Sequence, residues 1–211
     1  MTQRHREPAS GVGADQRREA MLEAAATIIA ERGFSETRIT DVARRVGASP
    51  ALVVYYFGTK DSLLTAALKH SENAFYQAAE EMLTGTPALR DRLEMLVRLT
   101  FVPQAQNEVP GAWGLWFDLW AQAFRHPQVA KDRIELDDRW RAMIQRVVED
   151  AVAAGEIAKV DAHEFAVTWS ALLDGLSIQV ALEDPAMPPD KAEVVALEFA
   201  KRELGVTRTR R

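Results

Sequence analysis

Apolar residues recur along this chain at intervals of three and four, and this spacing limits its fold more than any other feature of the sequence. The clearest example is the stripe formed by Met21, Leu22, Ala25, Ile28 and Ile29, and similar stripes continue to about residue 204. The alternating pattern of a half-buried strand is nearly absent. The sequence therefore predicts an all-α protein of about nine helices.

Glycine and proline divide these stripes into separate helices, because glycine closes a helix in a left-handed conformation and proline cannot continue one. Gly33, Gly47, Gly85 and Gly155 stand at such breaks. These glycine and proline positions predict a first helix that ends at Gly33, followed by helices at about 40–46, 50–57, 60–83, 88–103, 110–125, 127–154, 161–183 and 190–204.

Composition narrows the class of protein. With 211 residues, of which 47% are hydrophobic, the chain can bury a sizeable core and is not generally disordered. It has no cysteine, which excludes disulfides and thiolate chemistry and is compatible with a reducing cytoplasm. The first residues lack the apolar segment of a secretory signal, and no apolar run is long enough to span a bilayer. We expect a cytoplasmic protein without a membrane partner.

The formal net charge of -5 is unevenly distributed. Residues 1–60 contain 9 Lys and Arg against 7 Asp and Glu, a balance of +2, whereas residues 61–211 carry -7. This distribution, a mildly basic N-terminal part (the head, residues 1–60) and an acidic remainder, is expected if only the head contacts nucleic-acid phosphate. Ordinary scatter of surface charges is the alternative.

Two short predicted helices separated by Gly47, Ala48 and Ser49 match a helix-turn-helix better than a generic hairpin. Ser49 is a good N-cap, and Pro50 fits the first helical position, where its missing N–H costs nothing. In such a unit the second helix lies in the major groove of DNA, and the first crosses the backbone above it. The alternative is a plain helical corner.

Two adjacent tyrosines in the second of these helices favour DNA binding. If Val53 and Phe57 face inward one turn apart, Tyr55 and Tyr56 fall on other faces of a very short helix, and at least one phenol points outward. An exposed tyrosine can hydrogen-bond a phosphate or pack on a sugar or a thymine methyl group. A half-buried packing role is the alternative for Tyr56. Further candidates for phosphate contacts, near helix starts, are Thr37, Arg38, Thr40 and Lys60.

One segment resembles the DNA-binding part of the TetR (tetracycline repressor) family, namely GFSETRITDVARRVGASPALVVYYFGTKDSLL. The similarity covers about residues 15–65 and follows the family's order of elements. The resemblance implies phosphate contacts from Thr37, Thr40, Tyr56 and Lys60. It implies base-edge contacts from Pro50, Ala51, Leu52 and Tyr55.

Val54 departs from this pattern, because many members of the family have a phosphate-contacting tyrosine at that position. The contact is then lost or moved to neighbouring residues. Since Pro50 and Leu52 are poor hydrogen-bond donors, we expect sequence recognition to depend partly on Arg45, on Tyr55 and on DNA shape. The N-cap residue Ser49 completes the predicted DNA-binding set.

The rest of the chain is similar to the C-terminal domain of the choline-responsive betaine regulators (BetI type), in the runs AWGLWFDLWAQAFRHPQVA, RWRAMIQRVVEDAVAAGEI and ALLDGLSIQVAL. TetR resemblance implies that this part binds a small ligand and dimerises. We therefore predict four regions: a disordered tail at 1–14, a three-helix helix-turn-helix domain at 15–60, a larger helical ligand-binding and dimerisation domain at 61–205, and a disordered tail at 206–211.

An aromatic stripe lies on one face of the predicted helix 110–125. Most such stripes are core, so core packing alone is one interpretation. The other is a ligand pocket between helices. Because tryptophan faces attract quaternary ammonium groups, and Asp118 or Asp174 could add a carboxylate, a choline-like cation is conceivable. The predicted pocket residues are Phe101, Trp113, Trp116, Phe117, Trp120, Phe124, Trp140, Trp169 and Asp174.

The last two apolar helices are the predicted dimer contact. Family resemblance implies that they pair with their copies in a four-helix bundle; the alternative is that they close the core of the monomer. The candidates are Leu172, Leu173, Leu176, Ile178, Val195 and Phe199. Two heads about 34–36 Å apart, one turn of DNA, would read a palindrome.

Other chemistries are not supported by the sequence. Its four histidines have no partner at metal-ligand spacing along the chain, so we expect neither a metal site nor a cofactor. It has no thiol nucleophile, G-x-S-x-G motif or phosphate loop, and we expect no enzyme.

The favoured function is that of a homodimeric transcriptional repressor, released from a palindromic operator in double-stranded DNA by a small-molecule ligand. One alternative is a helical activator or architectural DNA-binding protein without a ligand switch. A second is a helical carrier or interaction module that no longer binds DNA, which Val54 and the small positive balance of the head favour.

Overall fold

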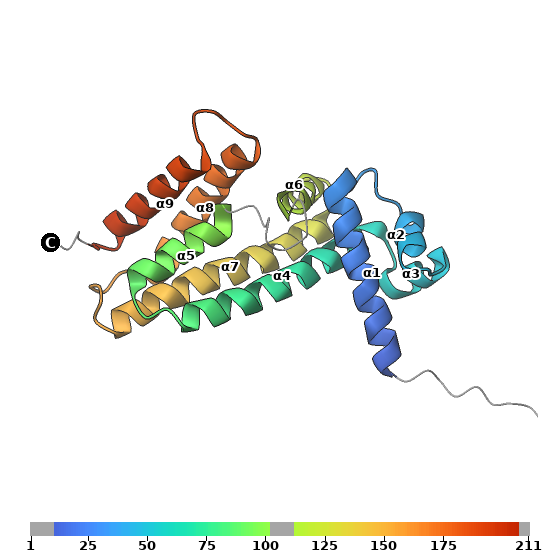
Figure 1. The fold of residues 1–211 in the computed structure, drawn as a ribbon, viewed down its shortest axis with the longest axis horizontal. Helices are drawn as coiled ribbons and strands as arrows, with labels where there is room; N and C mark the ends of the chain where they lie inside the picture. The colour runs from blue at the N-terminus through green and yellow to red at the C-terminus, as the bar shows by residue number, and fades with distance from the viewer. Residues whose placement is uncertain (1–10, 102–111, 207–211) are drawn as a thin grey trace, which may run out of the picture. The chain divides into compact units, whose positions relative to one another are not determined.

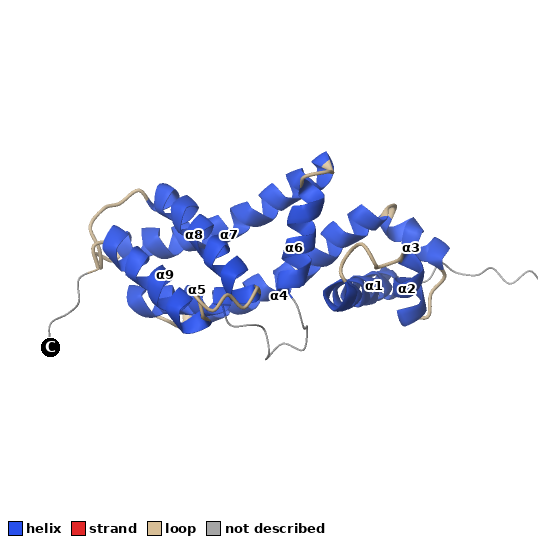
Figure 2. Cartoon of the chain, turned by 90° about the horizontal axis from the view of Figure 1, so that it is seen from above, coloured by secondary structure: helices blue, strands red, loops and turns tan. Residues whose placement is uncertain are grey.

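The computed structural model describes residues 11–101 and 112–206, and these residues form nine α-helices and no strand (Figures 1 and 2). The predicted all-α class is confirmed, and helix ends within the described residues agree with the predicted ends to within about two residues, apart from the start of the first helix. The helices are α1 (Gly11–Arg32), α2 (Ile39–Arg45), α3 (Pro50–Phe57), α4 (Lys60–Thr84), α5 (Leu89–Phe101), α6 (Ala112–Ala123), α7 (Pro127–Ala153), α8 (Ala162–Ala181) and α9 (Pro189–Glu203). Along the described residues, no helix combines the length and apolarity needed to cross a bilayer.

The predicted tails differ from the structure where it describes them. Helix α1 begins at Gly11, so residues 11–14 of the predicted N-terminal tail are helical. The sequence of α1 contains no proline that would interrupt the helix. At the other end, Val206 packs against the core, and its N–H donates to the Lys201 carbonyl at 2.9 Å. Residues 1–10 and 207–211 lie outside the described residues.

The chain divides into two compact units, which are described here separately. The first takes in the described residues of Met1–Ala74 and Val109–Val129, and the second those of Phe75–Glu108 and Ala130–Arg211. Helix α4 therefore contributes residues to both units. Compactness divides the chain differently from the functional boundary predicted at residue 60, which stays a prediction.

The first unit contains the predicted helix-turn-helix. Its buried residues include the whole first apolar stripe, from Met21 to Ile29, together with Val42 and Val53. Gly47 has a φ of 65°, a left-handed conformation that glycine adopts without the steric cost of a side chain, and it turns the chain between α2 and α3. Helices α1, α2 and α3 lie close together as this turn requires (Figure 1).

The second unit is built around one hydrophobic core that α5, α8 and α9 share with α7. Trp169 is fully buried, and its indole N–H donates to the Ala196 carbonyl at 3.0 Å, which joins α8 to α9. The Glu156 carboxylate accepts the Leu89 N–H at 2.7 Å and pairs with Arg92 at 2.8 Å. A carboxylate in this position satisfies a free N–H at the start of α5 and complements the helix dipole.

Candidate nucleic-acid interface and ligand site

Helix α3 presents one tyrosine to solvent. Val53 and Phe57 are buried, as expected, whereas 81% of Tyr55 is exposed. Tyr56 is half-buried, and its ring lies edge-on to that of Tyr55 with centroids 5.6 Å apart. The prediction that at least one phenol points outward is confirmed. Tyr56 supports the Tyr55 ring while its own ring also contacts Phe57.

The start of α3 is fixed by its predicted cap. The Ser49 hydroxyl oxygen accepts the Leu52 N–H at 3.2 Å, and Pro50 occupies the first turn. Ser49, Pro50 and Ala51 are exposed, and Leu52 is half-buried. The predicted base-contacting end of α3 is therefore accessible and held in one orientation, which is what recognition of a DNA groove requires.

Lys60 links the start of α4 to the loop between α1 and α2. Its ammonium group donates to the Ser35 carbonyl at 3.1 Å and lies 4.4 Å from the centre of the Phe34 ring. An ammonium group has three N–H donors, so this hydrogen bond leaves others for a phosphate. The two contacts restrict the lysine to the same side of the unit as the α1–α2 loop.

Thr37 is buried and has a structural role. Only 3% of the residue is exposed, and its hydroxyl donates to the Gly33 carbonyl at 2.9 Å. The hydroxyl satisfies a carbonyl at the end of α1 that has no partner within the helix. Thr37 therefore orders the loop before α2; its phosphate contact stays a prediction, which this burial does not favour.

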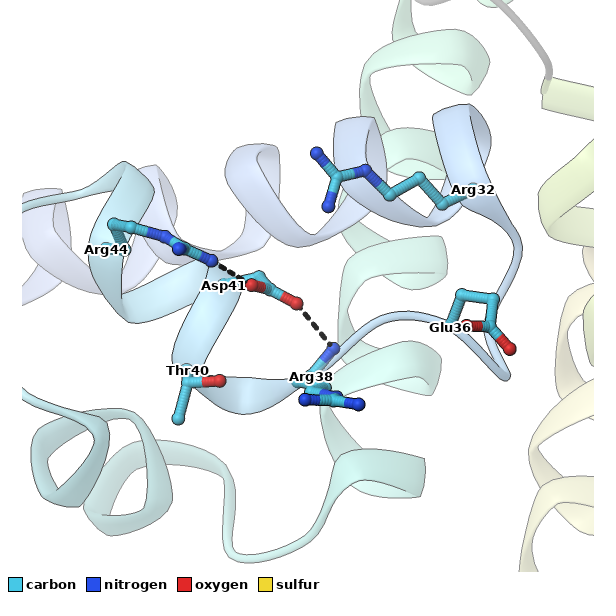
Figure 3. A pocket seen from close by; sticks show the side chains of 6 residues that line it. All are labelled: Arg32, Glu36, Arg38, Thr40, Asp41 and Arg44. Carbon is cyan, nitrogen blue, oxygen red and sulfur yellow. Dashed lines mark hydrogen bonds and ion pairs between the residues drawn. The ribbon is translucent and has the colours of Figure 1, made fainter.

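A depression of about 500 Å³ lies beside the first turn of α2 (Figure 3). Its lining comprises Arg32, Glu36, Arg38, Thr40, Asp41 and Arg44. Asp41 accepts the Arg38 N–H at 3.3 Å and pairs with Arg44, so this carboxylate orders the start of α2 (Figure 3). Arg38 and Thr40 were predicted from the sequence. The sequence analysis did not predict Arg32 and Arg44, because the sequence does not show that the end of α1 lies beside α2.

Arg45 pairs with Glu31 of α1 at 3.4 Å, and both side chains remain substantially exposed. An exposed pair of this kind is worth little, about 0–1 kcal/mol. A phosphate can therefore replace Glu31 as the partner of Arg45 at small cost.

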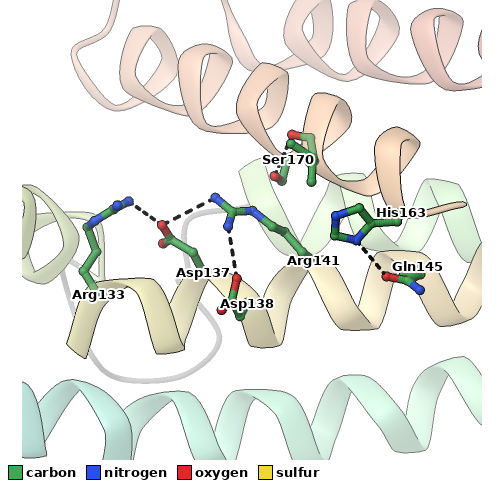
Figure 4. A network of polar contacts seen from close by, with 8 residues as sticks. Arg133, Asp137, Asp138, Arg141, Gln145, His163 and Ser170 are labelled. Atoms are coloured by element: carbon green, nitrogen blue, oxygen red, sulfur yellow. Dashed lines mark hydrogen bonds and ion pairs between the residues drawn. The ribbon is translucent and has the colours of Figure 1, made fainter. Parts of the chain in front are cut away.

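A second charged group lies on α7 in the second unit, on the helix that faces α8 in Figure 4. Asp137 pairs with Arg133 and lies 3.7 Å from Arg141, which also pairs with Asp138 at 3.1 Å. In Figure 4 the Arg141 guanidinium group points toward Asp137 and Asp138 of its own helix. The Arg141 Nε atom is buried and has no hydrogen-bond partner among the described residues.

Asp174 of α8 interacts with the same group. Desolvation first, and the nearby Asp137 carboxylate second, raise the pKa of Asp174 to about 6, while Arg141 and Arg133 act in the opposite direction. By its accessible surface Asp174 is exposed, so this end of the group is open to solvent. Desolvation also raises the pKa of Asp137, against the effect of its two arginines. Two carboxylates that disfavour each other's charge would both be relieved by a cation. We call Arg133, Asp137, Arg141 and Asp174 the α7–α8 charged cluster.

The predicted pocket aromatics are divided between the two units. Phe101 and Trp169 belong to the core of the second unit, which supports the core-packing interpretation for both. Trp140 is half-buried against that core, one turn from Asp137 on α7. Along α7 it stands between Asp137 and Arg141 of the α7–α8 charged cluster.

On α6, Trp116, Phe117 and Trp120 are half-buried in the first unit and form ring contacts of 5.8–6.0 Å. Phe124 is 92% exposed and is not enclosed within its unit. The side chain of Trp113 lies outside the described residues.

Asp118, the other candidate carboxylate, has a structural role in the head. It accepts the Phe34 N–H at 2.6 Å and so fixes α6 against the end of α1. Asp174 therefore remains as the carboxylate candidate for a cationic ligand.

The predicted dimer residues fall into two groups. Leu173 and Leu176 are buried within the second unit, 0% and 6% exposed, which favours the alternative that they close the core of one chain; their dimer role stays a prediction. Leu172, Val195 and Phe199 are half-buried and Ile178 is exposed. Two further apolar side chains are exposed nearby: Leu182, directly after the end of α8, at 70%, and Val194 of α9, at 59%.

One group of potential metal ligands converges within the first unit, formed by Glu19 and Glu23 of α1 and His70 of α4. Spacing along the chain could not reveal it, because its members lie on two helices.

Comparison with known families and proteins agrees with this geometry. The family model described as "Bacterial regulatory proteins, tetR family" matches residues 21–67, and "BetI-type transcriptional repressor, C-terminal" matches residues 88–205. The HTH-type transcriptional regulator BetI of Brucella anthropi is 30% identical over 184 residues, covering 86% of this chain and 89% of the relative. The BetI protein of Rhizobium meliloti is 24% identical and covers 89% of each chain.

Two solved structures share the fold over most of their length. A putative transcriptional regulator from Saccharomonospora viridis, in complex with choline, has a TM-score of 0.77 and 28% identity, covering 90% of this chain and 98% of its own. A putative TetR-family regulator from Rhodococcus sp. has a TM-score of 0.78 and 30% identity, covering 90% and 99%. The chain is a transcriptional regulator rather than an enzyme, and it belongs to the TetR family, with a C-terminal domain of the BetI type.

Proposed function

We propose that the protein is a homodimeric repressor whose first unit binds a palindromic operator and whose second unit binds a small cation that releases it. The exposed Tyr55 on a capped, glycine-turned α3 carries the DNA-binding part of this proposal. Apart from its contact with the Tyr56 ring, this large aromatic side chain is held in water and contributes little to packing within the first unit. Its position on the second helix of the helix-turn-helix is the one that enters a major groove.

Phosphate contacts would come from both sides of α3. Arg38, Thr40 and Arg44 border the depression beside α2, and Lys60 stands at the start of α4. Such contacts position the protein, whereas contacts from α3 to base edges select the sequence. Two heads in a dimer would place these surfaces on successive turns of one DNA face.

The ligand that we propose is a small cation of the quaternary ammonium class, bound at the α7–α8 charged cluster. The raised pKa of Asp174 supports this, since a cation stabilises the ionised carboxylates that desolvation and mutual repulsion disfavour. Trp140, one turn from Asp137, offers an aromatic face of the kind that attracts such cations. Choline is bound by the Saccharomonospora viridis regulator, which makes it the first ligand to test.

Release would follow from a difference in affinity. A ligand shifts an equilibrium between two geometries only by the difference between its affinities for them. Helix α4 contributes residues to both units, so it is the element through which we expect ligand binding to change the spacing of the heads.

Calorimetric titration with choline and with its neutral isostere 3,3-dimethylbutan-1-ol tests the ligand class. Choline should bind, the uncharged alcohol should bind at least about 10-fold more weakly, and Asp174→Asn should remove most of the difference. Choline affinity of the unchanged chain should also fall below pH 6, where Asp174 takes up a proton. Equal binding of both compounds would contradict a cationic ligand.

Fluorescence anisotropy with labelled DNA from upstream of the protein's own gene tests regulation by the ligand. Choline should weaken DNA binding by the unchanged chain, while Asp174→Asn should bind DNA equally well and respond less to choline. DNA binding that choline leaves unchanged in the unsubstituted chain would contradict release by this ligand.

The dimer is proposed from exposed apolar side chains of α8, of the residue that follows it, and of α9. Ile178, Leu182 and Val194 face solvent in a single chain, although each would gain from burial. Sedimentation analysis should show a dimer that Val194→Glu converts toward monomer. Phe124→Glu, a matched change at an exposed aromatic outside α8 and α9, should leave the dimer intact. A monomer in the unchanged chain would contradict this part of the proposal.

A further inference from the structure

Three side chains that can bind metal ions meet between α1 and α4 in the first unit. Glu19 and Glu23 are four residues apart on α1, so both lie on one face of that helix. His70 belongs to the part of α4 that lies in the same unit. One ligand atom from each residue lies within 4.8 Å of the ligand atoms of the other two.

None of these three side chains pairs with a group of opposite charge. In the described part of the chain, the side chains of Glu19, Glu23 and His70 form no ion pair and no hydrogen bond; the Thr27 hydroxyl donates to the backbone carbonyl of Glu23 and leaves its carboxylate without a partner. Like charges at this helical spacing destabilise a helix, and no arginine or lysine of the described residues pairs with either glutamate to offset them. Surface carboxylates of this unit commonly have such partners, as Glu31 has Arg45 and Asp41 has Arg44.

The donor set selects one class of ion. An imidazole nitrogen with two carboxylate oxygens suits Zn²⁺ and similar divalent transition metals, which accept three protein ligands and leave further positions to water. Ca²⁺ takes six to eight oxygen ligands, and Mg²⁺ is held mostly by oxygen and water, so one histidine in three ligands disfavours both. Small changes of the exposed glutamate rotamers would bring the ligand atoms to bonding distance of one ion.

We infer that Glu19, Glu23 and His70 form a binding site for a divalent transition-metal ion such as Zn²⁺, which joins α1 to α4. The ion cancels the repulsion between the glutamates and cross-links two helices of the head. Because the unfolded chain does not hold the three ligands together, bound metal raises the melting temperature of the protein. This site is independent of the proposed cation site on α7 and α8.

Titration of the tag-free, chelator-treated full chain with ZnCl₂ tests the inference by calorimetry. We expect saturable binding by the unchanged chain, and affinity lower by more than about 10-fold in His70→Ala and in the double variant Glu19→Gln, Glu23→Gln. His163→Ala is the matched control: this exposed histidine of α8 contacts Gln145 at 3.3 Å and is outside the site, so the variant should bind like the unchanged chain.

Thermal unfolding supplies a second measurement. Zn²⁺ should raise the melting temperature of the unchanged chain and of His163→Ala, and raise it much less in the two site variants. MgCl₂ should give no comparable shift. Binding and stabilisation that are the same in the unchanged chain and in the double glutamate variant, or no binding of Zn²⁺ to the unchanged chain, would overturn the inference. The glutamates are exposed, so their substitution does not disturb the core.

Discussion

Two charged groups, one in each unit, differ in the exposure of their arginines. Beside α2 the arginines face solvent, and 75% of the Arg44 side chain is exposed. In the α7–α8 charged cluster the side chains of Arg133, Asp137 and Arg141 are 34%, 14% and 32% exposed, while Asp174 is exposed. Exposed cations can neutralise an external polyanion, whereas the proposed role of the α7–α8 charged cluster is to bind a small cation.

This difference also separates residues that hold the fold from residues that serve binding. In the second unit Phe101, Phe165 and Trp169 are buried in the core. Trp169 is the largest fully buried side chain of the described residues. In the first unit Tyr55 remains in water. Substitutions of buried residues should therefore change mainly the stability of the fold, whereas substitutions of exposed residues in the first unit should change mainly DNA binding. Four substitutions test this contrast.

The largest effect is expected from Trp169→Ala. It leaves a cavity in the second unit and removes the donor to the Ala196 carbonyl, so the free energy of unfolding should fall by about 3–5 kcal/mol. Urea unfolding followed by circular dichroism measures this loss. Phe124→Ala, at an exposed aromatic, should change stability by less than about 0.5 kcal/mol. Similar losses from both substitutions would contradict the assignment of Trp169 to the core.

Asp174→Asn should change how stability depends on pH. The folded chain holds the Asp174 proton up to about pH 6, against an ordinary pKa of 3.8, so its contribution is fully present below pH 3.8 and is lost as the pH rises through 6. Asparagine cannot ionise. The melting temperature of the variant, relative to the unchanged chain, should therefore rise between about pH 4 and pH 6 and then stay level. A constant difference across this range would show that the substitution acts through contacts and not through charge.

Ser49→Ala should lower the free energy of unfolding by about 1 kcal/mol, the usual cost of losing an N-cap. Its hydroxyl is the side-chain partner of the Leu52 N–H at the start of α3. If the first unit melts separately, calorimetry should place the loss in its transition alone. A loss confined to the second unit would contradict the separation of the two units.

Lys60→Ala should have the smallest effect, on the salt dependence of DNA binding. Losing one phosphate contact lowers the slope of log affinity against log salt by about 0.9. Lys131→Ala, an exposed lysine of the second unit, is the control and should leave the slope unchanged. An unchanged slope in Lys60→Ala would mean that its contacts with Ser35 and Phe34 are its whole function.

Much of the fold and part of the head could be predicted from local sequence patterns. Helix ends were visible because Gly33, Gly47 and Pro50 act within one turn of their own position. The exposure of Tyr55 also follows locally, since Val53 and Phe57 fix which face of a short helix is buried.

The remaining site features depend on contacts between distant segments. The burial of Thr37 and the position of Arg32 follow from the path of the loop between α1 and α2. The α7–α8 charged cluster joins Asp137 to Asp174, although the i, i+4 pairs on α7 look like ordinary surface pairs in the sequence. Apolar spacing shows which face of α8 is buried, but it does not distinguish burial within one chain from burial in a dimer, as Leu173 and Leu176 illustrate.

The most direct test of the central claim is operator binding by the first unit's exposed surface. Fluorescence anisotropy would measure the affinity of the full chain for DNA from upstream of its own gene across a salt series, beside the double variant Tyr55→Ala, Tyr56→Ala. We predict tight, salt-dependent binding to one short palindrome that the double variant loses although circular dichroism shows that it remains folded at the temperature of the measurement. Weak binding that is the same in both proteins and indifferent to DNA sequence would contradict the claim that α3 recognises an operator.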